Sequence, residues 1–155
     1  MIDRRMFLAG ALVLPALSSP SSARETLPTV SVTKDPSCGC CSAWAEHLRQ
    51  SGFPVSITES TELNRVKARL GVPKALASCH TAEVGGYVIE GHVPADEIKR
   101  LLVERPAGKG LAVPGMPTGS PGMEVDGASP DLFEVILFDN TGQRVFARYR
   151  GALRA

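Results

Sequence analysis

The chain has 155 residues, with 17 basic and 16 acidic side chains and a formal net charge of +1. This near balance gives no electrostatic reason to expect binding to nucleic acid or to an anionic membrane surface. After the first residues, no apolar stretch approaches the about 20 residues of a transmembrane helix. We therefore expect no membrane span once the leader described next is removed.

Residues 1–23 are predicted to be an export signal. Arg4 and Arg5 precede an apolar run at 6–14, and small residues at 21–23 supply a cleavage site. The segment R-R-M-F-L resembles the twin-arginine export consensus, and an ordinary secretory signal is the alternative. We expect a periplasmic protein in which residues 24–155 form one domain, since that length is typical of a single hydrophobic core.

The apolar pattern then predicts strands and helices in alternation. In chain order these are a strand at 29–34, a helix from the first cysteines to 49, a strand at 53–58, a helix at 62–70, strands at 81–84 and 87–90, and a helix at 95–104. Gly85-Gly86 accepts the positive φ of a tight turn between the paired strands. The order β-α-β-α-β-β-α, with right-handed crossovers, predicts a thioredoxin-like α/β fold.

Two additions follow this core. Residues 111–123 form a loop rich in Gly, Pro and Met, and residues 133–138 and 144–149 are predicted to form a C-terminal β-hairpin around the turn sequence D-N-T-G.

Three cysteines, Cys38, Cys40 and Cys41, lie where the first strand meets the first helix. Cys38 and Cys41 have the C-x-x-C spacing of thioredoxin-like redox sites, whereas Cys40 is a third thiol that disulfide exchange does not need. Thiols at a helix N-terminus favour the thiolate, which binds soft metals. Disulfide geometry allows Cys38–Cys41, or a bridge from any of the three to Cys79. At least one thiol of the cluster is then free or bound to a metal; a structural disulfide with two buried thiols is the alternative.

Cys79 and His80 come just before the third predicted strand, which in this topology begins beside the cysteine cluster. Thioredoxin-like oxidoreductases have a cis-proline here, so the Cys-His-Thr sequence weakens that interpretation and adds soft ligands. We predict that Cys79 is a ligand and that His80 is a ligand or orients one. His92 is expected only to begin the third helix, and His47 to lie on the surface of the first.

The loop contains two methionines, Met116 and Met123, with little apolar surface nearby in the sequence. Thioether sulfur suits Cu(I), so we predict both as metal ligands; the alternative is that they anchor the loop to the domain. A four-thiolate zinc site is disfavoured, because structural zinc usually binds two separated C-x-x-C pairs. Four acidic residues are expected on solvated faces or in the first turn of a helix: Glu83, Glu90, Asp96 and Glu97.

Taken together, the C-x-C-C cluster, S-C-H-T at 78–81, G-G-Y-V-I-E-G-H-V-P at 85–94 and P-G-M-P-T-G-S-P-G-M-E at 114–124 resemble the small CopG-like periplasmic proteins found with copper-resistance determinants. The resemblance extends from about residue 30 to residue 149. It implies a thioredoxin-like fold that binds copper as a thiolate-bridged Cu(I) cluster, with a role in copper redox handling. The ligands it implies are Cys38, Cys40, Cys41, Cys79, Met116 and Met123.

Two functions remain open. The first is an exported protein that binds copper ions, as Cu(I) and in a multinuclear cluster, for copper resistance or copper redox handling, with another periplasmic copper or redox protein as its candidate partner. The alternative is a periplasmic thiol–disulfide oxidoreductase that uses Cys38 and Cys41, with Cys79 as the resolving thiol. In an intermediate case, the cysteines change the oxidation state of copper.

Overall fold

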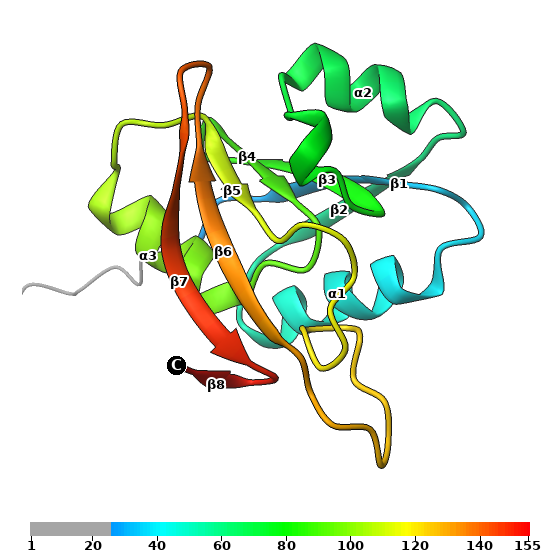
Figure 1. Cartoon of the computed structure of the whole chain (residues 1–155). Coiled ribbons are helices and arrows are strands. Elements are labelled where there is room, and N and C mark those ends of the chain that lie inside the picture. Colours follow the sequence, from blue (N-terminus) through cyan, green and yellow to red (C-terminus); the bar gives the residue numbers. More distant parts are fainter. Residues whose placement is uncertain (1–25) are drawn as a thin grey trace, which may run out of the picture.

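The structure is a computed structural model that describes residues 26–155, which form three α-helices, one short 3-10 helix and an eight-stranded mixed sheet (Figure 1). The predicted export signal at 1–23 lies outside the described residues. None of the helices in residues 26–155 is long and apolar enough to cross a membrane.

The predicted order β-α-β-α-β-β-α is present from the first strand to the third helix. The elements are β1 (Val30–Lys34), α1 (Gly39–Gln50), β2 (Val55–Glu59), α2 (Leu63–Leu70), the 3-10 helix η1 (Lys74–Leu76), β3 (His80–Val84), β4 (Tyr87–Glu90), α3 (Ala95–Glu104), β5 (Gly110–Ala112), β6 (Leu132–Phe138), β7 (Gln143–Arg150) and β8 (Leu153–Arg154). The predicted C-terminal hairpin is β6 and β7, which pair antiparallel.

The strands lie in the order β2-β1-β3-β4-β5-β6-β7-β8, with β1/β2 and β4/β5 parallel and all other pairs antiparallel. Helices α1 and α3 pack on one face through Trp44, Leu48 and Ile98, in the main core that includes Ile89 of β4. Val88, the neighbour of Ile89, belongs to a second cluster on the other face, which Leu70 of α2 contacts. Figure 1 shows α2 and α1 on opposite sides of the sheet.

Strand β5 corrects the expectation that residues 111–123 form only a loop. Gly110, Leu111 and Ala112 are buried between β4 and β6. A Cβ on Gly110 would lie 1.8 Å from the carbonyl oxygen of Val88, so this strand approaches β4 so closely that only glycine is accommodated there. The irregular loop therefore begins at residue 113.

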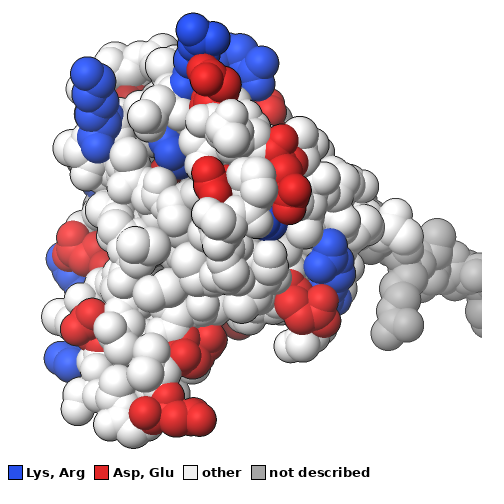
Figure 2. Space-filling model, turned by 90° about the vertical axis from the view of Figure 1, so that its right-hand side faces the viewer, with Lys and Arg blue, Asp and Glu red and all other residues white. Residues whose placement is uncertain are grey.

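Charged side chains of both signs are distributed over the surface. The face shown in Figure 2 has small groups of Lys and Arg interspersed with Asp and Glu around a broad uncharged area. This distribution agrees with the near balance of charge in the sequence.

Candidate metal centre

The turn between β1 and α1 carries the first three cysteines and is held by local hydrogen bonds. The Asp35 carboxylate accepts from the amide of Ser37 (2.9 Å), and the Cys38 amide donates to the Asp35 carbonyl (3.1 Å). Lys34, only 4% exposed, donates to the carbonyls of Asp35 (2.9 Å) and Pro36 (3.3 Å). Cys38 is the N-cap of α1, so the cluster occupies the beginning of that helix.

All four cysteine sulfurs lie within 4.8 Å of one another. Cys38 and Cys41 form a disulfide, whereas Cys40 and Cys79 are free, half-buried thiols. The Cys40 sulfur is 3.5 Å from that of Cys38 and 3.8 Å from that of Cys79. The pairing is one that the spacing allowed. The structural alternative was one disulfide with two buried thiols; the disulfide is present, but both remaining thiols are only half-buried. A two-electron reduction of the disulfide would make all four sulfurs available as thiolates.

Cys79 also belongs to a second group of donors. Its sulfur lies 3.3 Å from Nδ1 of His80 and 3.0 Å from Nε2 of His92, and these three donor atoms lie within 4.8 Å of one another. His92 Nδ1 is 2.8 Å from the Pro121 carbonyl, which can only accept, so the proton is assigned to Nδ1. The lone pair on Nε2 then faces the Cys79 sulfur, an arrangement typical of metal-binding histidine.

The expectation that His92 merely begins the third helix is wrong. His92 is fully buried and faces Cys79. A signal for this was present in the sequence, because a two-residue Gly85-Gly86 turn fixes the register of the hairpin. The observed pairs run from Val84 with Tyr87 to Thr81 with Glu90, and continuing the same register places residue 79 opposite residue 92.

Burial keeps this group of donors uncharged when no metal is bound. It raises the pKa of the Cys79 thiol to about 12, with the nearby Cys40 thiol adding to the shift. It lowers the pKa of His92, and it holds the pKa of His80 well below the ordinary value, with the proximity of His92 and of the Lys67 ammonium group adding to the shift. A bound cation would therefore replace the thiol proton of Cys79, which couples metal binding to proton release.

Residues 113–124, here called the strap, cross from β5 over the beginning of α1, where the loop is drawn in yellow in Figure 1. A Cβ on Gly122 would lie 2.6 Å from the Trp44 amide nitrogen and 2.9 Å from the Cys40 carbonyl oxygen. Nearer the start of the strap, the Ser78 hydroxyl donates to the Gly115 carbonyl. The strap thus contacts both segments that carry cysteines.

Both predicted methionine ligands lie on the strap. Met116 is 53% exposed, whereas Met123 is half-buried and follows the residue that contacts α1. The exposure of Met116 disfavours the alternative in which its side chain anchors the loop by packing.

Trp44 belongs to the main core and forms one wall of the histidine group. The side chain is fully buried, and its Nε1 donates to the carbonyl of Val93 (2.9 Å). The indole ring centroid is 4.3 Å from that of His80, which in turn meets the His92 ring edge-on at 5.0 Å. Ring packing therefore restrains His80 between Trp44 and His92, while the Pro121 carbonyl orients His92.

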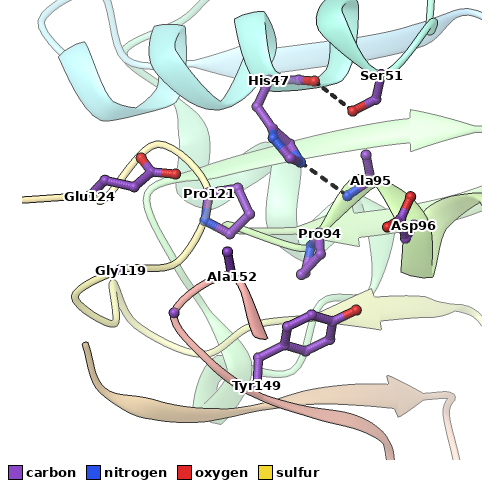
Figure 3. A pocket seen from close by; sticks show the side chains of 11 residues that line it. His47, Ser51, Pro94, Ala95, Asp96, Gly119, Pro121, Glu124, Tyr149 and Ala152 are labelled. Carbon is purple, nitrogen blue, oxygen red and sulfur yellow. Dashed lines mark hydrogen bonds between the residues drawn. The ribbon is translucent and has the colours of Figure 1, made fainter. Parts of the chain in front are cut away.

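The expectation that His47 lies on the helix surface is also wrong. His47 is half-buried, and its Nε2 accepts a hydrogen bond from the amide of Ala95 (3.2 Å), as Figure 3 shows. This contact satisfies an amide at the beginning of α3 that has no partner within its own helix. His47 also lines a cavity of about 200 Å³ with Asp96, Pro121 and Glu124. It belongs to neither donor group described above.

Two of the four acidic residues expected on solvated faces or in a first turn are buried. Glu90 is 0% exposed and pairs with Lys67. Glu97, in the first turn of α3, is 2% exposed and pairs with Arg100 (2.8 Å). Each carboxylate is buried because a cationic partner from the folded chain compensates its charge.

Comparison with known proteins identifies the family. Residues 76–123 match a family described as "Protein of unknown function, DUF411". No curated protein sequence is similar enough to count as a match. The chain is similar to two solved structures of copper resistance protein copG. Form 2 is 42% identical with a TM-score of 0.74, and the match covers 79% of this chain and 98% of that chain. Form 1 is 43% identical with a TM-score of 0.75, covering 81% and 99%.

The identity is high and the match extends over nearly all of both copG structures. The cysteine and histidine groups of this chain bring together donor atoms of the kinds that hold metal ions in proteins. The chain therefore belongs to the CopG-like family of copper resistance proteins.

Proposed function

We propose that this chain is an exported, periplasmic protein that binds Cu(I) through cysteine thiolates and strap methionines, for copper resistance or copper redox handling. The observation that carries the proposal is the convergence of four cysteine sulfurs within 4.8 Å of one another. Thiolates and thioethers are the ligands that select Cu(I) over harder cations. The copper resistance proteins to which the chain is similar support copper as the metal.

The proposed ligands are Cys38, Cys40, Cys41, Cys79, Met116, Met123 and His80, to which the geometry adds His92. A multinuclear cluster is supported by the position of Cys79, whose sulfur belongs to both donor groups. A thiolate in that position can bridge two copper ions. The half-buried cluster would retain Cu(I) away from bulk water, with Met116 exposed at the outer surface.

We also propose that the core is thioredoxin-like. Support comes from the order β-α-β-α-β-β-α, from the parallel pairing of β1 with β2, and from the position of Cys38 at the junction of β1 and α1. In such a core the beginning of β3 lies beside that junction, which accounts for the approach of Cys79 to Cys40.

The alternative function is a thiol–disulfide oxidoreductase, and the Cys38–Cys41 disulfide favours it. This enzyme would reduce insulin disulfides without copper and without Met116 or Met123. Copper binding and thiol–disulfide chemistry are combined in one function if the reduced cysteines reduce Cu(II). One dithiol then gives two electrons, releases its two thiol protons to solvent and becomes a disulfide, while two Cu(II) ions become two Cu(I) ions.

Competition for Cu(I) between the reduced mature protein and a chromophoric chelator, without oxygen, tests the proposal. We expect Cys40→Ser to weaken Cu(I) binding at least about tenfold, or 1.4 kcal/mol, and Met116→Leu to weaken it measurably. Ser42→Ala, on the exposed side of α1, is the matched control and should bind like the parent. If both Cys40→Ser and Met116→Leu bind as tightly as the parent, the ligand assignment is wrong.

A further inference from the structure

Helix α2 attaches to the sheet in an unusual way. Its one buried residue is Lys67, which is 7% exposed, while Leu63, Val66 and Leu70 are only partly buried. A surface helix normally buries an apolar stripe. Burying an ammonium group costs free energy unless the group is fully paired, and even a well-made buried ion pair is on average no more stabilising than apolar side chains of similar volume. Stability alone therefore does not account for a lysine at this position.

Lys67 belongs to a closed hydrogen-bond network around Glu90 of β4. Its ammonium group donates to Oε1 of Glu90 (2.5 Å) and to the hydroxyl of Thr81 (2.9 Å). The Thr81 hydroxyl donates to Oε2 of Glu90 (2.6 Å), and the backbone amide of Ser78 donates to Oε1 (2.6 Å). One fully buried carboxylate thus holds three donors from three segments of the chain.

Two of these donors flank the metal centre. Ser78 and Thr81 are the residues on either side of Cys79 and His80. The amide of Ser78 precedes β3, so no sheet ladder fixes it. Glu90 supplies that restraint from the neighbouring strand, and Lys67 compensates the charge of Glu90. The position of the Cys79 sulfur, 3.8 Å from that of Cys40, therefore depends on groups that do not touch it.

We propose that Lys67 and Glu90 are positioning residues that hold Cys79 and His80 against the C-x-C-C segment. The consequence for copper binding rests on the proposed function, whereas the consequence for the position of the Cys79 thiol rests on the geometry alone. The two are measured separately.

The first measurement uses the metal-free protein with its disulfide intact. Glu90→Gln preserves the size of the side chain, but its amide cannot accept hydrogen bonds at both ends. We expect iodoacetamide to alkylate Cys79 at least about tenfold faster than in the parent, with the site located by peptide mass spectrometry. Thr81→Val is a milder change that removes one donor to Glu90, and we expect a smaller increase, about threefold. If Glu90→Gln does not fold, the rate of Cys79 alkylation in Thr81→Val tests the same inference.

Glu97→Gln is the matched control. Glu97 is an equally buried carboxylate that pairs with Arg100 (2.8 Å) and accepts from the Tyr149 hydroxyl (2.7 Å), without contacts to the cysteine segments. The alkylation rate of each variant is measured at the same number of degrees below that variant's own thermal unfolding midpoint. Differences in overall stability then do not affect the comparison of rates. If Cys79 reacts no faster in Glu90→Gln and Thr81→Val than in Glu97→Gln, the ion pair is only structural and the inference is overturned.

The second measurement is the Cu(I) affinity of the reduced proteins. We expect a loss of at least about tenfold in Glu90→Gln and none in Glu97→Gln. A parent that fails to bind Cu(I) would refute the proposed function, while the alkylation rates would still decide the positioning role. A parent that binds Cu(I), with Glu90→Gln binding equally well, would overturn the inference and leave the proposed function standing.

Discussion

Replacing Gly122 tests whether the strap is held against α1. Gly122 has a φ of +83°, and a Cβ there would lie 2.6 Å from the Trp44 amide nitrogen and 2.9 Å from the Cys40 carbonyl oxygen. Both are backbone atoms of a helix, so they cannot rotate away as a side chain would. Gly122→Ala must therefore displace the strap.

Two energetic costs add in Gly122→Ala. A left-handed backbone costs a residue other than glycine about 1–2 kcal/mol. Displacement of the strap also removes the hydrogen bond between His92 Nδ1 and the Pro121 carbonyl (2.8 Å), worth about 0.5–1.5 kcal/mol. We therefore expect the free energy of unfolding to fall by roughly 1.5–3.5 kcal/mol, and Cu(I) affinity to fall as well, because His92 loses the group that orients it.

Urea unfolding of the disulfide form and Cu(I) competition of the reduced form measure these two effects. Gly127→Ala is the control, because Gly127 has a similar φ of +75° but no heavy atom within 4 Å of its added Cβ. It lies outside the strap and should lose only the about 1–2 kcal/mol of backbone strain, with unchanged Cu(I) affinity. Equal stability and equal affinity of the two variants would refute a role for the strap contact.

Two further predictions concern the histidines. His92→Phe should weaken Cu(I) binding about tenfold, whereas His47→Phe should not, as judged by the same chelator competition; equal affinities would exclude His92 as a ligand. Burial lowers the pKa of His47, His80 and His92 below 6.5, so the unfolded chain takes up protons first as the pH falls. Stability of the metal-free protein should be full above about pH 7 and decline below about pH 6.5, by up to about 1.4 kcal/mol per pH unit for each histidine. Equal urea midpoints at pH 7.5 and pH 5.5 would contradict this.

Most of the secondary structure was predictable, because its signals are local. Helix α3 (Ala95–Glu104) has the predicted bounds, since Pro94 precedes it and Pro106 follows it closely. The Gly85-Gly86 turn gives the predicted β3–β4 hairpin. Strand β5 was missed because its three residues, Gly110–Ala112, lack any alternation and depend on strands on both sides. A segment of three residues is too short to show a sequence pattern that would reveal its pairing with distant strands.

The candidate site was predictable where topology determines it. Placing the beginning of the third strand beside the first brings Cys79 near Cys40, as the structure has it. The burial of Glu90 was not predictable, because a single carboxylate in a strand resembles a solvated residue until its partner is known. That partner, Lys67, comes from helix α2, which is distant from β4 in the sequence, so only the folded chain reveals the pair.

The measurement we would make first is an anaerobic Cu(I) titration of the mature protein against a chromophoric chelator, in its reduced form and in its Cys38–Cys41 disulfide form. We predict more than one tightly bound Cu(I) per reduced chain and fewer in the disulfide form, because oxidation removes two of the four thiolates. A reduced protein that fails to outcompete the chelator would contradict a copper-thiolate function. The thiol–disulfide oxidoreductase would then be the better explanation of the cysteine cluster.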